Sequence, residues 1–169
     1  MTTFNLRHVK LHAAEQLRTE LEVELDGLVL GGQEYLPAPA LAASELLITK
    51  TTTGSVFELS FGVRLRGPCF RCLADTELEL PIHAREYHAT DPGADEELRS
   101  PYVADDVLDL SAWARDSLAL ALPEKILCRP DCAGLCPACG KDLNVEPHEH
   151  EETGSDSRWS ALEALRNSE

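Results

Sequence analysis

Residues 57–82 read FELSFGVRLRGPCFRCLADTELELPI, and the architecture can be worked outward from this run. Residues 57–65 alternate apolar side chains with polar residues or glycine, and residues 78–82 alternate apolar side chains with glutamate or proline. A period of two puts every second side chain on the same face of an extended chain. Both runs therefore predict β-strands with one buried face.

The residues between the two predicted strands, GPCFRC at 67–72, favour a turn because glycine and proline interrupt regular structure. We therefore expect an antiparallel hairpin whose tip carries Cys69 and Cys72. Pro81 lies inside the second strand and has no N–H group to donate to a neighbouring strand. This predicts that the second strand lies at a sheet edge.

The rest of the first half also favours strands, so we predict an α+β protein with a mainly antiparallel β N-terminal half. Residues 21–25 alternate leucine or valine with glutamate, and residues 46–53 are expected to form a further β segment that ends at Gly54. Residues 89–101 are rich in Asp, Glu, Pro and Gly and predict an exposed loop.

A central helix is expected after this loop. Apolar residues recur three and four positions apart between 110 and 122, which predicts a helix with one face packed on the sheet. Asp109 or Ser111 can cap its start, and Pro123 ends it. Trp159, Leu162 and Leu165 indicate a short C-terminal helix, capped by Asp156 or Ser157.

Length, composition and charge limit the classes of protein to which this chain can belong. The chain has 169 residues, of which 43% are hydrophobic, and no apolar stretch approaches the ~20 residues that cross a bilayer. The first residues lack the basic and apolar regions of an export signal, so we expect a cytoplasmic protein. The formal net charge of −15 disfavours non-specific binding to nucleic acids, because phosphate backbones are also negative.

Six cysteines stand in two clusters, spelled Cys69-x2-Cys72 and Cys128-x3-Cys132-x3-Cys136-x2-Cys139. A two-residue spacer lets a tight turn aim two sulfurs at one tetrahedral ion, and Gly140 allows the positive φ that such a turn favours. Clustered pairs of this kind in a cytosolic chain indicate metal binding more often than disulfides. The sequence therefore predicts a structural Zn²⁺ site, with all six cysteines as candidate ligands.

The pattern leaves the ligand set open. Cys69 and Cys72 can be joined by Cys136 and Cys139 or by Cys128 and Cys132, and the last four cysteines can also form a local set. We favour sets that include Cys69 and Cys72, because a shared ion would then hold the second half of the chain against the hairpin tip. The expected organisation is a single β-rich zinc-binding domain over residues 1–143 and an acidic tail with the short helix over 144–169.

Two alternatives use the same thiols differently. The Cys-x-x-Cys pairs could serve a thiol redox protein or sensor, but neither pair stands at the start of a helix in a βαβ pattern. A tetrathiolate site also accepts iron, as in an electron carrier. No phosphate loop, nucleophile elbow or carboxylate pair is present, so we expect neither an enzyme nor a small-molecule substrate.

Several motifs together closely resemble the bacterial YceD family. They are GPCFRCL at 67–73, the segment 109–123, LCRPDCAGLCPACG at 127–140 with DLN at 142–144, and RWSAL at 158–162. The resemblance implies a metal-binding protein that supports accumulation of large-subunit ribosomal RNA, with ribosomal RNA or ribosomal and rRNA-processing proteins as partners. Some family members lack the second Cys-x-x-Cys, which raises the weight of a site built from the first four cysteines.

An RNA-facing patch is a further hypothesis. Its members would present cations and one stacking ring near the first cysteines: Arg64, Arg66, Phe70, Arg71, Arg129 and Lys141. The favoured alternative is that the strand arginines only solvate the sheet or offset the negative charge of a zinc tetrathiolate. For His148 and His150 we favour a solvated tail over a weak metal site.

Overall fold

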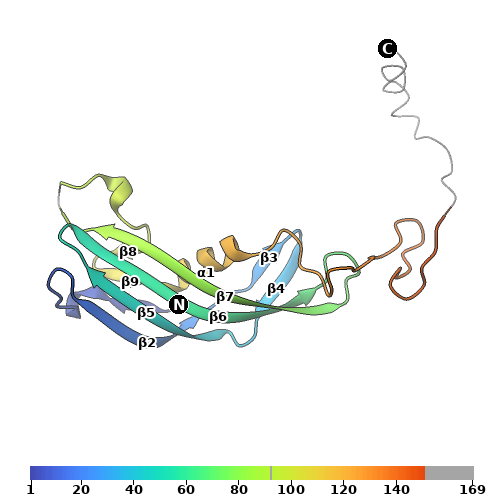
Figure 1. Cartoon of the computed structure of the whole chain (residues 1–169), viewed down its shortest axis with the longest axis horizontal. Helices are drawn as coiled ribbons and strands as arrows, with labels where there is room; N and C mark the ends of the chain where they lie inside the picture. Colours follow the sequence, from blue (N-terminus) through green and yellow to red (C-terminus); the bar gives the residue numbers. More distant parts are fainter. Residues whose placement is uncertain (92, 151–169) are drawn as a thin grey trace, which may run out of the picture.

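A long antiparallel hairpin of β6 (Gly54–Pro68) and β7 (Asp75–Ala89) forms the spine of the fold. The computed structural model describes residues 1–91 and 93–150 (Figure 1). Strand pairing runs without a break from Gly54 opposite Ala89 to Pro68 opposite Asp75. The predicted hairpin is therefore confirmed, and it places residues 69–74 at its far tip.

Further strands complete an antiparallel sheet around β6. Its other edge pairs with β5 (Leu41–Lys50) along residues 55–61 and with β4 (Gln33–Pro37) at residues 65–66. On this side of β6, β2 (Gln16–Glu24) pairs with β5 and β3 (Leu28–Leu30) pairs with β4.

The position of β7 confirms the inference from proline. Pro81 lies opposite Gly62 of β6, and within the described residues β7 has no second strand neighbour. The predicted β segment at 46–53 is shifted, because β5 ends at Lys50 and a turn follows it. In this turn the Thr51 N–H donates to the carbonyl of Gly54 at 3.0 Å. A Cβ at Gly54 would collide with the His88 carbonyl oxygen, so the close approach of the two strands requires glycine there.

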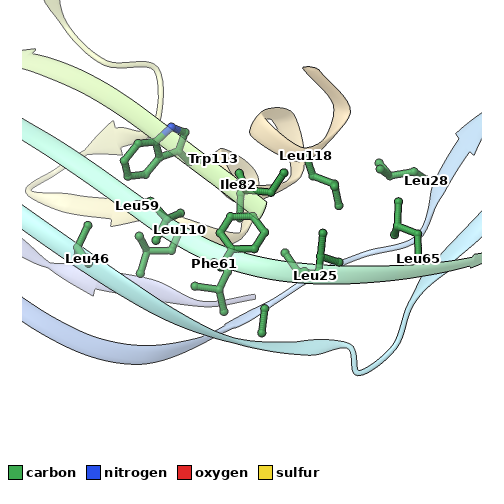
Figure 2. Packing of buried hydrophobic residues seen from close by; sticks show 14 of the residues in the cluster. Leu25, Leu28, Leu46, Leu59, Phe61, Leu65, Ile82, Leu110, Trp113 and Leu118 are labelled. Atoms are coloured by element: carbon green, nitrogen blue, oxygen red, sulfur yellow. The ribbon is translucent and has the colours of Figure 1, made fainter. Parts of the chain in front are cut away.

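The helix α1 (Leu110–Ala121) is capped by Asp109, one of the two caps that the sequence offered, and Ser111 lies inside the helix. The Asp109 carboxylate accepts a hydrogen bond from the Ala112 N–H at 3.0 Å, and the helix ends before Pro123. Its apolar face packs on the sheet, where the buried cluster includes Leu110, Trp113, Leu118, Leu59, Phe61 and Ile82 (Figure 2). This packing buries one face of the sheet and leaves its charged face outside.

Short elements around the helix were not predicted from the sequence. A small sheet of β1 (Thr3–Asn5), β8 (Val103–Ala104) and β9 (Val107–Asp109) leads directly into α1. Two 3-10 turns, η1 (Leu6–His8) and η2 (Glu96–Leu98), complete the described elements. The expected C-terminal helix falls outside the described residues. Across residues 1–91 and 93–150, every helix falls short of the length and apolarity needed to span a membrane.

Two leucines of α1 provide a matched test of this packing. Leu118 is 1% exposed, whereas Leu120, one half-turn away, is 89% exposed. We expect Leu118→Ala to lower the free energy of unfolding by about 2–5 kcal/mol because it leaves a cavity, and Leu120→Ala to change it by less than about 0.5 kcal/mol. Urea unfolding of both variants measures this difference, and equal effects would contradict the assigned helix face.

Candidate metal centre

The tip of the β6–β7 hairpin is a tight turn that holds two buried cysteines, Cys69 and Cys72. The Cys69 N–H donates to the Ala74 carbonyl at 2.7 Å, and the Leu73 N–H donates back to the Cys69 carbonyl at 3.0 Å. Leu73 adopts a φ of 61°, a left-handed conformation that reverses the chain after the second cysteine. Both sulfurs are thereby held on one side of the turn.

The chain after α1 runs to this tip and docks on it (Figure 1). The Phe70 N–H donates to the Ile126 carbonyl at 2.8 Å, and the Arg71 guanidinium donates to the Cys132 carbonyl at 2.6 Å. Gly134 makes the contact close: its φ is +82°, and a Cβ there would lie 3.0 Å from the Arg71 carbonyl oxygen. Backbone contacts therefore align the second cysteine segment with the first.

Four sulfurs converge where the two segments meet. The Sγ atoms of Cys69, Cys72, Cys128 and Cys132 all lie within 4.8 Å of one another. The Sγ–Sγ distance is 3.8 Å between Cys69 and Cys132 and 3.6 Å between Cys72 and Cys128. A tetrahedral ion with Zn–S bonds of about 2.3 Å separates its sulfurs by about 3.8 Å, so this spacing fits zinc. Of the ligand sets that the sequence left open, the structure brings this one together.

The thiols of this cluster differ strongly in acidity. Burial raises the pKa of the Cys69 thiol, but hydrogen bonds from the N–H groups of Cys72, Cys128 and Arg71 outweigh it and lower the pKa to about 6. Desolvation and the neighbouring thiols raise the pKa of Cys128 to about 12. Four thiolates this close repel one another, so full ionisation requires a cation among them.

Asn144 supports the cluster from the outside and was not singled out from the sequence. Its side-chain N–H₂ group donates to the Cys132 Sγ at 3.5 Å. Its carbonyl oxygen accepts hydrogen bonds from the Ala133 N–H at 2.8 Å and from the Arg129 guanidinium at 2.7 Å. The Asp142 carboxylate fixes the amide, accepting from it at 2.6 Å. The sequence signal that could have pointed to Asn144 is the DLN triplet at 142–144, which is part of the family resemblance.

Cys136 and Cys139 do not join the four-sulfur cluster. Their sulfurs lie instead beside ring nitrogens of His148 and His150, with the four ligand atoms within 4.8 Å of one another. The Cys139 Sγ is 3.1 Å from the His148 Nε2. The histidines that we expected in a solvated tail therefore return to the second cysteine pair.

Acidic partners face four of the proposed RNA-binding cations. The Arg64 Nη2 lies 2.6 Å from Glu79, and the Arg66 Nε lies 2.6 Å from Glu77 on the neighbouring strand. The remaining pairs join Arg129 to Asp131 and Lys141 to Glu146.

The other two members of the proposed patch lie at the hairpin tip. Arg71 donates to the Cys132 carbonyl, as described above. Phe70 is 40% exposed, and the Lys125 Nζ lies 5.3 Å from its ring centroid. The six residues thus extend from β6 across the tip to the second cysteine pair, and their contact with RNA stays a prediction.

A family model described as "Large ribosomal RNA subunit accumulation protein YceD" matches residues 57–166. The chain belongs to the YceD family. The match begins in β6 and includes β7, α1 and both cysteine segments, so the family region contains every candidate ligand.

Relatives of this YceD member include uncharacterized proteins of Mycobacterium tuberculosis and Bacillus subtilis. The mycobacterial protein is 33% identical over 128 residues, which are 73% of this chain and 61% of the relative. The Bacillus protein YlbN is 30% identical over 116 residues, which are 64% of this chain and 66% of the relative. The chain therefore spans less than two thirds of the mycobacterial relative. No solved structure matches it significantly.

Asn144 offers a test of the support around the first cluster. We expect Asn144→Ala to lower zinc affinity about 10- to 100-fold, because two hydrogen bonds are lost: the one from the amide to the Cys132 sulfur and the one from the Ala133 N–H to the amide oxygen. Competition with a chromophoric chelator measures the affinity. Asn5→Ala, which removes an exposed cap far from the cysteines, is the control and should leave it unchanged. Equal affinity in all three proteins would contradict a supporting role for Asn144.

Proposed function

We propose that this YceD-family protein is a non-enzymatic zinc protein that supports accumulation of large-subunit ribosomal RNA. The observation that carries the metal assignment is the convergence, within 4.8 Å, of four sulfurs from segments 56 to 63 residues apart. The family description carries the ribosomal role. The zinc ligands in this proposal are Cys69, Cys72, Cys128 and Cys132.

The ion has a structural role in this proposal. Four protein ligands close the coordination shell of zinc and leave no position for a substrate or for an activated water. Within residues 1–91 and 93–150, Leu127 and Leu135 are the partly buried apolar residues that pack against the buried cysteines, so the apolar contacts around this cluster are few. Zinc would then stabilise the docking of the second segment on the hairpin tip, by on the order of 10 kcal/mol in small zinc modules.

The ribosomal partner is ribosomal RNA or a ribosomal or rRNA-processing protein. The net charge of −15 and the ion pairs of the strand arginines both weaken attraction to phosphates. Basic ribosomal proteins fit this surface better, because opposite charges steer partners together. We place this contact in the cytoplasm, where ribosomes assemble.

Metal analysis tests the assigned centre. We expect colourless purified protein with bound zinc, and loss of this zinc from Cys69→Ser and Cys132→Ser because each change removes one ligand from a closed site. Mass spectrometry of metal content and alkylation of the native protein with iodoacetamide give the readouts. Thiols that react freely in metal-free, folded protein would favour the thiol redox alternative, and visible absorbance would favour iron.

A gene deletion with complementation tests the ribosomal role. We expect the deletion to lower the ratio of large-subunit to small-subunit ribosomal RNA, and wild-type protein but not Cys69→Ser to restore it. Quantitative sequencing of total RNA measures the ratio. His12→Ala, at an exposed position outside both cysteine segments, is the matched control and should restore it fully. An unchanged ratio in the deletion strain would remove the proposed role.

A further inference from the structure

The second cysteine pair lies in a tight turn of its own. The Gly140 N–H donates to the Cys136 carbonyl at 2.8 Å, and Gly140 adopts the positive φ of 73° expected from the sequence. The N–H groups of Cys139 and Ala138 hydrogen-bond to the Cys136 sulfur. Backbone N–H groups aimed at a sulfur stabilise it as a thiolate, which is the form that binds a metal.

A small hairpin holds this turn in place. Leu135 pairs with Asp142 in an antiparallel bridge, and the Cys136 N–H donates to the Lys141 carbonyl at 2.8 Å. A turn then sends the chain back toward the cysteines, with the Glu146 N–H donating to the Asp142 carbonyl at 2.9 Å. The residues that follow are thereby placed beside Cys139.

The orientation of His148 is the one that a metal ligand needs. Its Nδ1 lies 2.7 Å from the Glu146 carbonyl, which can only accept, so the proton is on Nδ1. In the neutral ring the other nitrogen, Nε2, then presents its lone pair toward the Cys139 Sγ, which is 3.1 Å away. Metal-bound histidines typically donate their second ring N–H to a carbonyl or carboxylate in this way.

His150 completes the set of donors. Its ring meets the ring of His148 edge to face, with centroids 4.9 Å apart. Two sulfurs and two imidazole nitrogens within 4.8 Å are one of the donor sets that structural zinc uses. We propose that Cys136, Cys139, His148 and His150 bind a second zinc ion.

This second site is separate from the four-sulfur centre and does not depend on its role. Two ligands of the second site, Cys139 and His150, are exposed, whereas Cys128 is the one exposed ligand of the first cluster and its other three cysteines are buried. Chelators therefore reach the second ion more easily, and we expect it to leave first. The ligands follow one another within 15 residues, so the ion closes a local loop and does not join distant segments.

Counting metal ions in the full chain tests the second site. After saturation with zinc and desalting, native mass spectrometry should find two ions in the wild-type chain and one in His148→Ala/His150→Ala. The matched control is His8→Ala/His12→Ala, which changes two exposed histidines outside the clusters and should keep two ions. The ion that remains in the first variant also reports that the protein is folded.

Substitution by cobalt gives a second readout, because imidazole shifts the visible bands of Co²⁺ to shorter wavelength than thiolate does. The absorbance lost in His148→Ala/His150→Ala should be the part at shorter wavelength. Two zinc ions in that variant would overturn the proposal, as would a wild-type chain with a single ion that Cys132→Ser removes. Loss of the second ion alone from Cys136→Ser would support the second site. This result does not depend on the ribosomal role proposed for the protein.

Discussion

The molecule depends on one constraint, which is that two segments with their own backbone structure must bring four sulfurs together at the tip of a hairpin. The β6–β7 ladder carries Cys69 and Cys72 away from the core that α1 covers. The second segment reaches them through backbone hydrogen bonds to residues 70 and 71. Few apolar contacts surround the meeting point, and four close thiolates repel one another. A bound cation would change this repulsion into the attraction that holds the segments.

The long hairpin also explains the charge of the surface beside the cysteines. Arg64 lies opposite Glu79 and Arg66 opposite Glu77 in the strand register, so each cation meets a carboxylate on the solvent face. Exposed pairs of this kind add little to stability, because water already solvates both charges. These pairs affect recognition, because the glutamates neutralise the positive charge of the stretch of β6 that is basic in sequence. The proposal that the partner is a basic protein and not bare phosphate rests on this pairing together with the net charge of −15.

The two cysteine pairs of the second segment are used differently because Gly134 separates them. Its left-handed conformation and its contact with Arg71 bring the residues before it against the hairpin tip. The residues after it form a separate small hairpin that extends past the tip. Cys128 and Cys132 therefore face the first pair, whereas Cys136 and Cys139 face the histidines that follow them. Asn144 joins both parts, because it contacts Cys132 and lies at the turn that returns toward His148.

Local patterns in the sequence determined the hairpin, the edge position of its second strand, the helix with Asp109 as one of two possible caps, and the six cysteines as candidate ligands. Each of these depends on residues close together in the chain, where a period, a cap or a proline acts on its own neighbours. Strands of two or three residues, such as β8 and β1, are too short to show a period and were missed. Only the tertiary structure decided which sulfurs meet, because the three ligand sets satisfy the same spacing rules. The roles of Asn144 and His148 were hidden for the same reason: they depend on how the chain path brings distant groups within bonding distance.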